Sequence, residues 1–276
     1  MDTKTIINFS PTGMVPTRAM TPHVPITPVE IIEQVHQAYE LGITLVHIHA
    51  RDDGEAPTWD PKVYQRIFEG VRKHCPDLII CGSTSGRNFP EFEKRSAVIE
   101  LRPDLCSLTL SSLNFVRQAS MNPPDVVRGL AQKMRDHGVK PEFECFDLGM
   151  INYGLYLIRK GVAQAPFYWN LFFGNIAGMQ ASLAQIGVAV AQLSAEEHYV
   201  SLGGIGGSQL PVSATAVAHG FGVRTGLEDN IWFDAEETIQ ATNIDLLKRV
   251  HALMKLHGRQ LFTAAEFGQR GFYNGR

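Results

Sequence analysis

His47 and His49, in the stretch TLVHIHARDDG (44–54), are the side chains whose types and spacing most directly suggest chemistry. Residues two apart in a strand point the same way, about 6 to 7 Å from one another, so these two imidazoles can bind one metal ion. A catalytic zinc usually takes three protein ligands and keeps one position open. The spacing therefore predicts a zinc site that needs a third ligand. Hydrogen-bonded histidines in a core or cleft are the alternative.

Glu228 is the best-placed third ligand, because it follows the last predicted strand, which can face the strand of the two histidines across a barrel. Zinc is favoured by two imidazoles and a carboxylate, although manganese, cobalt or iron could occupy the same ligands. For His23 and His219 a structural or substrate-facing role is as good as a metal-binding one. The remaining histidines fall on predicted helices or helix ends and are expected to be solvated: His74, His137, His198, His251 and His257.

Polar residues also occupy the ends of other predicted strands. They are Ser83, Thr84, Ser107, Thr109, Glu142, Glu144, Arg224 and Asp229. Glu144 could equally be a structural acid, and Arg224 could merely neutralise the neighbouring carboxylates. Asp52 and Asp53 are interpreted as residues that close the loop after their strand.

The glycine-rich stretch SLGGIGGSQ (201–209) resembles a loop that binds phosphate at a helix N-terminus. Gly204 and Gly206 are therefore candidate cofactor-binding residues, although glycine-rich loops are common.

The elements that must position these residues alternate between strands and helices. Eight apolar runs predict strands, at 5–10, 44–50, 78–83, 105–110, 141–146, 167–174, 199–204 and 220–226. Thr27, Pro28 and Glu30 form a capping-box pattern, and Asp234 with Glu237 has the same spacing, which predicts a second helix start. The alternation predicts an α/β fold, a (β/α)8 TIM barrel in one domain spanning 1–276.

The predicted barrel has a long first βα loop (10–28), which lies on the functional face, and a C-terminal helical extension. An open doubly wound sheet is the competing fold, but the first strand is not followed by its usual G-x-G-x-x-G pattern.

Composition narrows the classes of partner. The chain has 276 residues, 44% of them hydrophobic, and a net charge of -3, which gives no electrostatic reason to expect nucleic acid or a membrane. Its four cysteines contain no C-x-x-C pair, so a disulfide framework is not expected. With no apolar stretch of membrane-spanning length, a cytoplasmic protein that binds small molecules is predicted.

Several segments together resemble the β-keto acid cleavage enzyme family. In order they are TG with TRA (12–19), PITP (25–28), VHIHARDD (46–53), STSG (83–86), SLNF (112–115), PEFECFDLGM (141–150), GGIG (203–206) and VRTGLEDNIW (223–232). The resemblance implies a zinc-dependent barrel, usually a homotetramer, that converts a β-keto acid and acetyl-CoA into acetoacetate and a new acyl-CoA. It also implies zinc ligands at His47, His49 and Glu228.

The resemblance further implies roles for other strand-end residues. Ser83, Ser107, Glu144, Arg224 and Asp229 would line the substrate pocket, where Thr84 and Thr109 also lie by position. The implied reaction deprotonates C2 of the keto acid, adds the enolate to the thioester, transfers CoA and cleaves by a retro-Claisen step. Free guanidinium has a pKa above about 12, so Asp229 acting through Arg224 or a water is preferred to arginine as a literal base. Glu144 is the third candidate catalytic residue.

One position departs from the family pattern. Where members that cleave 3-keto-5-aminohexanoate use an acidic residue of the first loop to receive the amino group, this sequence has Val15. A buried ammonium without a carboxylate is costly, so a keto acid with an apolar or other non-amine tail is predicted.

Two other functions remain open at this point. One is a metal-dependent C–C lyase of the HMG-CoA lyase type, which would need no second thioester. The other is a barrel that binds zinc or acyl-CoA without turnover.

Overall fold

The computed structural model describes residues 4–193 and 197–275, and its centre is a closed barrel of eight parallel strands. In chain order these are β2 (Ile7–Phe9), β3 (Leu45–Ile48), β6 (Ile79–Gly82), β7 (Leu105–Thr109), β10 (Lys140–Cys145), β11 (Phe167–Phe173), β12 (His198–Gly204) and β13 (Gly222–Thr225). Each pairs with its neighbours in sequence, and β13 closes onto β2. The predicted (β/α)8 barrel is confirmed, and all eight predicted strands are present.

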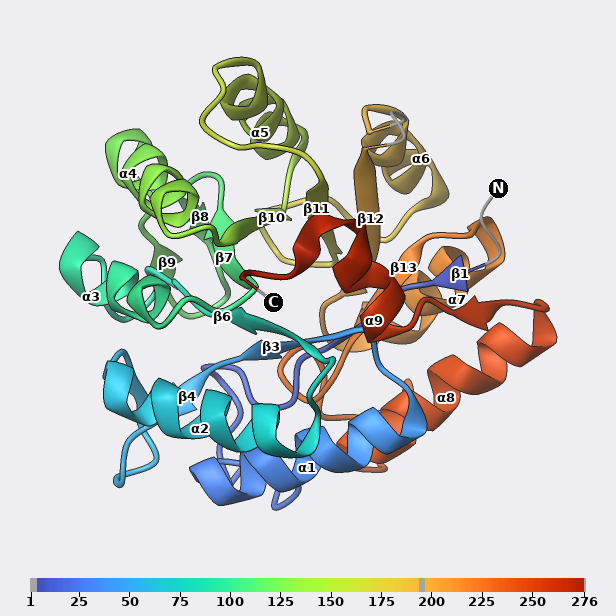
Figure 1. Ribbon diagram of the computed structural model, residues 1–276. Helices are drawn as coiled ribbons and strands as arrows, with labels where there is room; N and C mark the ends of the chain where they lie inside the picture. Colours follow the sequence, from blue (N-terminus) through green and yellow to red (C-terminus); the bar gives the residue numbers. More distant parts are fainter. Residues whose placement is uncertain (1–3, 194–196, 276) are drawn as a thin grey trace.

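Helices surround this barrel (Figure 1). They are α1 (Pro28–Leu41), α2 (Pro61–His74), α3 (Phe92–Ser96) with a 3-10 turn (Ala97–Leu101), α4 (Pro124–Asp136), α5 (Leu148–Arg159), α6 (Leu183–Ala191), α7 (Gln209–His219) and α8 (Asn243–Leu256). No helix in the described ranges is long and apolar enough to cross a membrane.

The start of α1 follows the capping box predicted from Thr27 and Glu30. The Thr27 hydroxyl accepts from the Glu30 N–H at 3.3 Å, and the Glu30 carboxylate accepts from the Thr27 N–H at 2.9 Å. Both bonds satisfy donors that the first helical turn leaves without partners. Arg18 of the first loop adds two 2.9 Å bonds to the same carboxylate, so the helix start also fixes that loop.

The second helix start predicted from sequence is wrong. Asp234 begins a turn in which its carboxylate accepts from the Thr238 and Ile239 N–H groups, and Glu237 has a left-handed φ of 56°. The helix instead begins after Thr242, whose hydroxyl accepts from Asp245. An aspartate caps a turn as readily as a helix, so its spacing alone did not distinguish them.

His198 and His251 depart from the expectation of solvated positions on helices. His198 is the first residue of strand β12, where its ring stacks on Trp169 with centroids 5.6 Å apart. His251 is on α8 as expected, but it is half-buried and its Nε2 lies 2.9 Å from the Gly42 carbonyl oxygen.

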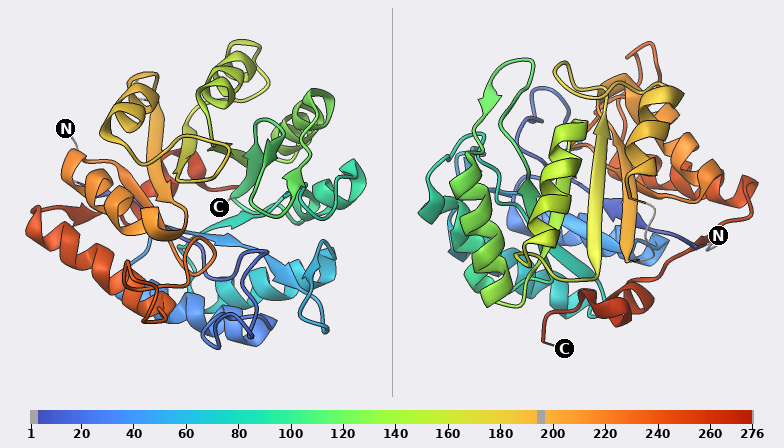
Figure 2. Two further views of the ribbon diagram at one scale, coloured as in Figure 1. Left: turned by 180° about the vertical axis from the view of Figure 1, so that it is seen from behind. Right: turned by 90° about the horizontal axis from the view of Figure 1, so that it is seen from above.

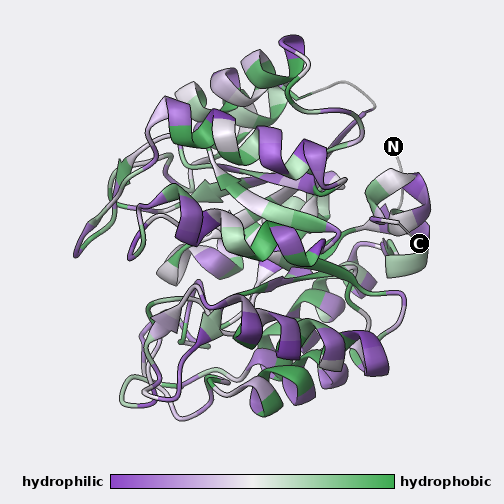
Figure 3. Cartoon of the chain, turned by 60° about the vertical axis from the view of Figure 1, so that its left-hand side comes forward, coloured by the Kyte–Doolittle hydropathy of each residue, from purple (hydrophilic) through white to green (hydrophobic). Residues whose placement is uncertain are grey.

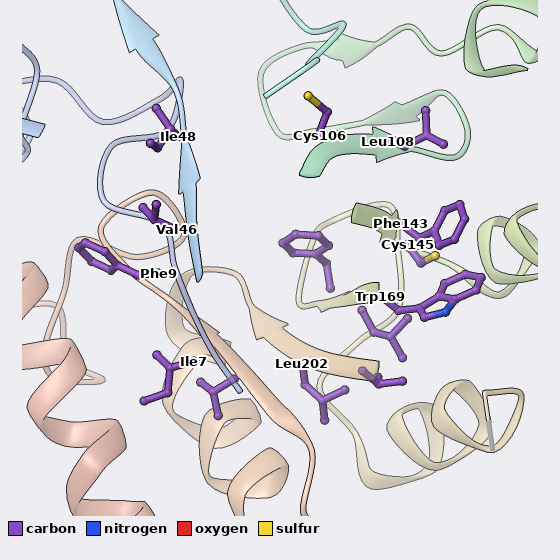
Figure 4. Packing of buried hydrophobic residues seen from close by; sticks show 14 of the residues in the cluster. Ile7, Phe9, Val46, Ile48, Cys106, Leu108, Phe143, Cys145, Trp169 and Leu202 are labelled. Carbon is purple, nitrogen blue, oxygen red and sulfur yellow. The ribbon is translucent and has the colours of Figure 1, made fainter. Parts of the chain in front are cut away.

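Alternate residues of the strands face two different surroundings. The outward set packs against the helices, as Figure 4 shows for Ile7, Val46, Leu108 and Trp169. In Figure 3 the central strands are accordingly mostly green, whereas the helices alternate between green and purple. The inward set changes character along the barrel, from apolar at one end to polar and ionisable at the other. This change separates a structural end from the end that carries the site.

The apolar end is closed by the C-terminal segment. After α8 come β14 (Gln260–Leu261), which pairs with β1 (Lys4–Thr5), then α9 (Ala264–Phe267) and a turn of π-helix (Gly268–Phe272). Phe267 and Phe272 stack with centroids 4.0 Å apart and meet Tyr168 from inside the barrel. This segment crosses the barrel in Figure 1 and lies below the strands in Figure 2 (right). We call it the floor.

The opposite end carries the longer loops. The first βα loop is held by Arg51, which donates to the carbonyl oxygens of Gly13 and Pro16 at 2.8 to 3.1 Å. Two small hairpins stand beside it, β4 (Ala50–Arg51) with β5 (Pro57–Thr58) and β8 (Leu113–Asn114) with β9 (Ala119–Ser120). We call this end the mouth.

Candidate active site

A cavity of about 590 Å³ opens at the mouth of the barrel. It lies where the carboxyl ends of the parallel strands meet, the position at which barrel enzymes carry their active sites. Its wall includes the predicted site residues Val15, Ser83, Thr109, Gly206, His49, Glu144, Arg224, Glu228 and Asp229.

His47, His49 and Glu228 converge beside this cavity. The Nε2 atoms of the two histidines are 3.2 Å apart, and Glu228 Oε1 lies 3.3 Å from His49 Nε2 and 4.0 Å from His47 Nε2. Two atoms that bind one tetrahedral zinc at ~2.0 to 2.1 Å are about 3.3 to 3.4 Å apart. The second oxygen of Glu228 is buried without a hydrogen-bond partner among the described residues. The donor set therefore fits a divalent metal ion.

Gly13 explains why the first loop can lie so close to Glu228. It has a left-handed φ of 64°, and a Cβ at this position would lie 2.5 Å from Glu228 Cγ. Only glycine fits both the backbone conformation and the close approach. The loop thereby covers one side of the carboxylate.

Glu142 lies behind His47 and orients it. Its Oε2 accepts from His47 Nδ1 at 2.6 Å, which leaves Nε2 as the metal-facing nitrogen. The other oxygen of Glu142 accepts from Asn8 at 2.7 Å and from Asn170 at 2.5 Å. Sequence placed Glu142 at a strand end but gave it no role. The PEFEC alternation, which puts it on the same face as Glu144, was the available signal.

Burial and the neighbouring carboxylates have opposite effects on the pKa values of the two histidines. Burial opposes protonation of His47, but Glu142 and Glu228 outweigh it and raise its pKa to about 9. For His49 burial prevails over Glu228 and lowers the pKa. Of the two imidazoles, His47 is therefore the one that more readily carries a positive charge when no metal is bound.

Arg224 and Asp229 form the second cluster. Arg224 Nε donates to Asp229 Oδ2 at 2.9 Å, and its Nη2 lies 2.8 Å from Glu228 Oε1. Although burial disfavours its charge, Asp229 and Glu228 raise the pKa of Arg224 well above its usual value. Burial, with the help of Glu228 and against Arg224, raises the pKa of Asp229. Ser10, which sequence did not single out, also donates to Asp229 Oδ2 at 3.2 Å.

Glu144 faces the same space from β10. Thr109 donates to its Oε2 at 2.7 Å, and its Oε1 is 3.9 Å from Arg224 Nη1. Burial raises the pKa of Glu144, and the neighbouring Glu142 adds to this, while His47 and Arg224 oppose it. A carboxylate with a raised pKa accepts a proton more readily, so Glu144 and Asp229 are the two candidate proton carriers of the site.

Not every predicted pocket residue reaches the cavity. Ser83 and Val15 line it, Val15 with 45% of its surface exposed. Thr84 and Ser107 lie beneath its surface, where Thr84 N–H donates to the Ser107 hydroxyl at 3.0 Å and the Thr84 hydroxyl donates back to the Ser107 carbonyl. They connect β6 to β7 under the cavity, and their contact with a substrate stays a prediction.

The glycine-rich loop lies against the Asp229 segment. The Gly206 N–H donates to the Asp229 carbonyl oxygen at 2.8 Å, so this amide is not free to bind a phosphate. Gly204 ends β12, where a Cβ would lie 2.3 Å from the Ser208 carbonyl oxygen. The loop therefore packs against the Asp229 segment with Gly206 at the cavity wall, and a cofactor role for Gly204 and Gly206 stays a prediction.

Three further candidates lie outside the cluster. His23 and His219 are exposed, His219 in the last turn of α7. Asp52 closes its loop as interpreted, because its carboxylate accepts from the Gly54 and Ala56 N–H groups at 2.9 Å.

The family of the chain follows from this site together with a direct comparison. The family model described as beta-keto acid cleavage enzyme matches residues 4–270. The chain belongs to this family, and it is an enzyme of the (β/α)8 class.

Two relatives illustrate the range of the family. The chain is 36% identical over 263 residues to the 3-oxoadipate:acetyl-CoA acetyltransferase of Cupriavidus necator, covering 95% of this chain and 92% of that one. It is 32% identical to the 3-keto-5-aminohexanoate cleavage enzyme of Fusobacterium nucleatum, covering 96% and 97%.

Among solved structures, the binary complex of ObcA with oxaloacetate has a TM-score of 0.77 at 21% identity, covering 91% of this chain and 68% of that one. This likeness supports the fold.

Proposed function

We propose that this chain converts a β-keto acid and acetyl-CoA into acetoacetate and a new acyl-CoA, with zinc or another divalent metal bound by His47, His49 and Glu228. The observation that carries the proposal is the convergence of these three ligands beside the Arg224–Asp229 pair in one cavity. The acetyl-CoA-dependent reaction named for the Cupriavidus necator relative supports it.

Each part of the site has a task in this reaction. A bound metal supplies positive charge that stabilises the negative charge developing on the keto oxygen. Asp229, acting through Arg224 or a water molecule, removes a proton from C2. The raised pKa of Arg224 keeps its guanidinium protonated, so it is not the base. Its positive charge can instead stabilise the negative charge that develops on the substrate. Glu144 is the second carboxylate that can carry the proton.

In the proposed reaction, bonds form and break in the following order. C2 attacks the thioester carbonyl and CoA leaves as the thiolate. The thiolate adds to the original keto carbon, and the bond from that carbon to C2 breaks. Acetoacetate and the new acyl-CoA leave after C2 regains its proton.

The tail of the keto acid is proposed not to be an amine. Val15 lines the cavity, and it stands where the resemblance to enzymes that cleave 3-keto-5-aminohexanoate implies an acidic residue of the first loop. The described lining of the cavity includes Met14, Pro16 and Met20 from the same loop, and none of these is acidic. Faster turnover of 3-keto-5-aminohexanoate than of an unsubstituted 3-keto acid of the same length would refute this point.

The test is an assay of the metal-loaded protein with a panel of β-keto acids, with and without acetyl-CoA. We expect acetoacetate and a new acyl-CoA to form only when acetyl-CoA is present, and both to disappear in Glu228→Ala. Cleavage without a thioester would support the lyase function instead. Bound metal without turnover would support the binding barrel.

A further inference from the structure

Arg87 differs from the other arginines that border the mouth and are at least half-buried. Arg51 donates to backbone carbonyl oxygens, Arg95 donates to carbonyl and side-chain amide oxygens, and Arg224 pairs with carboxylates. Among the described residues, no hydrogen bond or ion pair reaches the guanidinium of Arg87, and its Nε is buried without a partner. Leaving a buried charged donor without a partner is costly, so its presence calls for an acceptor that comes from outside the chain.

The position of Arg87 is fixed although its donors are free. Its guanidinium carbon lies 3.6 Å from the ring centroid of Phe115, on the β8–β9 hairpin. Stacking uses the face of the guanidinium and leaves its N–H edge available to a carboxylate. Gln118 of the same hairpin donates to Asn88 at 3.0 Å and connects the hairpin to the Arg87 loop. The side chain is therefore preorganised to bind an anion.

Aromatic rings connect Arg87 to the catalytic cluster along the cavity wall. Phe115 meets Phe146 edge to face at 5.5 Å, and Phe146 stacks on Phe172 at 4.5 Å. Arg224 lies over Phe172 at 4.8 Å. All five side chains line the cavity. The wall is thus apolar in the middle with a guanidinium at each end, which matches a molecule with an apolar middle and an anion at each end.

We propose that Arg87 binds a carboxylate at the distal end of the keto acid, so that the preferred substrates are 3-keto dicarboxylic acids. The inference rests on the proposed function, because it takes the other end of the substrate to lie at the metal and Arg224. It makes Arg87 a specificity-determining residue, and it explains why a non-acidic Val15 suits the same cavity.

A phosphate of CoA is the competing anion. The thioester must reach the buried acids, so the phosphates at the far end of the long CoA molecule lie outside the cavity. Arg117, exposed at the tip of the β8–β9 hairpin, is better placed for them than the half-buried Arg87. The geometry therefore favours the keto acid as the ligand of Arg87.

The test compares 3-oxoadipate with its distal monoamide, which has nearly the same shape but no distal charge. For the unchanged enzyme we expect kcat/KM to be about 100-fold higher on the diacid, because a charge-assisted bidentate pair is lost with the amide. Arg87→Met should lower kcat/KM about 100-fold on the diacid and less than about threefold on the monoamide. The KM for acetyl-CoA should not change. Arg66→Met, at an exposed position of α2, is the matched control.

The outcomes separate this inference from the proposed function. Equal losses on both substrates in Arg87→Met, or a raised KM for acetyl-CoA, would overturn the role of Arg87. Turnover of both substrates at equal rates by the unchanged enzyme would overturn it too, while the proposed function would stand. If neither substrate turns over, the proposed function fails. Calorimetric binding of diacid and monoamide to metal-loaded protein then tests Arg87 by itself, and equal affinities would exclude its role.

Discussion

The floor and the mouth of this barrel differ in the polarity of their buried side chains, which are mainly apolar at the floor and mainly polar or ionisable at the mouth. At the floor, Phe267 and Phe272 stack on each other, meet Tyr168 edge to face and cover the apolar lower layer of the strands. At the mouth, buried carboxylates, imidazoles and a guanidinium crowd one small volume, and Glu228 Oε2 has no hydrogen-bond partner among the described residues. Burial of apolar rings stabilises the fold, whereas burial of charge costs free energy that ion pairs within the site and a bound ligand must offset. Along the barrel axis, the floor therefore mainly stabilises the fold, whereas the mouth carries the candidate active site.

The largest effect is expected at the mouth, from Glu228→Ala. The variant removes one of three candidate metal ligands, so kcat/KM should fall at least about 1,000-fold and bound metal should be lost. Metal content by mass spectrometry is measured alongside the rate, and an unchanged circular dichroism spectrum of the variant distinguishes ligand loss from a folding defect. Glu33→Ala, at an exposed carboxylate on α1, is the control. Full metal content together with full activity in Glu228→Ala would contradict the assignment.

The reverse pattern is expected at the floor, from Phe267→Ala. The side chain is fully buried between Phe272, Phe262 and Tyr199, so its loss should lower the free energy of unfolding by about 3 to 5 kcal/mol. The folded fraction should keep its kcat, since the floor does not reach the cavity. Urea unfolding and a rate normalised to folded protein measure both.

Leu256→Ala is the control for the floor variant, because this side chain is 82% exposed and should cost no more than about 0.5 kcal/mol. A large fall in kcat for folded Phe267→Ala would break the separation of the two ends.

Glu142→Gln tests a residue between the two ends. The amide oxygen can still accept from Asn8 and Asn170, but its NH₂ then faces His47 Nδ1. His47 must turn its proton to Nε2, the nitrogen that would bind metal. Metal affinity should fall about 10- to 100-fold while the fold is kept. Unchanged affinity in a metal titration would show that Glu142 does not set the tautomer.

The smallest effect is expected from Glu30→Gln, at the start of α1. Although burial opposes it, hydrogen bonds from Thr27, Ile26 and Arg18 lower the pKa of Glu30 to about 2, below its usual 4.5. Its stabilising effect is therefore present above pH 4.5 and is lost as the pH falls toward 2. The site is partly exposed, so the difference in unfolding free energy should be about 1 kcal/mol or less at pH 7.

Chemical denaturation of both proteins between pH 7 and pH 3 measures this difference. We expect it to narrow as the pH falls. A difference that grows toward acid would mean that the carboxylate does not act through its charge.

The sequence predicted the strands well because parallel strands buried on both faces are apolar runs, and each of the eight kept its predicted place. It predicted that His47 and His49 lie side by side because the i and i+2 positions of a strand share a face. The helix start predicted at Asp234 is wrong because an aspartate carboxylate accepts hydrogen bonds from backbone N–H groups in a turn as readily as at the start of a helix. The roles of Glu142, Ser10 and Arg87 could not be predicted from the sequence. Glu142 and Ser10 contact residues that are distant in sequence, and Arg87 stacks on a distant hairpin while its guanidinium has no hydrogen-bond partner among the described residues. No local sequence pattern indicates such contacts.

The floor also sets an order in time. Phe262, Phe267 and Phe272 leave the ribosome after every strand of the barrel, and β14 must still pair with β1 from the other end of the barrel sequence. During synthesis the lower layer of Leu45, Ile79 and Leu105 is therefore exposed to solvent until these three phenylalanines have been synthesised. A nascent chain halted before residue 262 is expected to contain all eight barrel strands but to bind chaperones through its exposed apolar layer. This risk follows from a barrel whose base is closed by the part of the chain that is synthesised last.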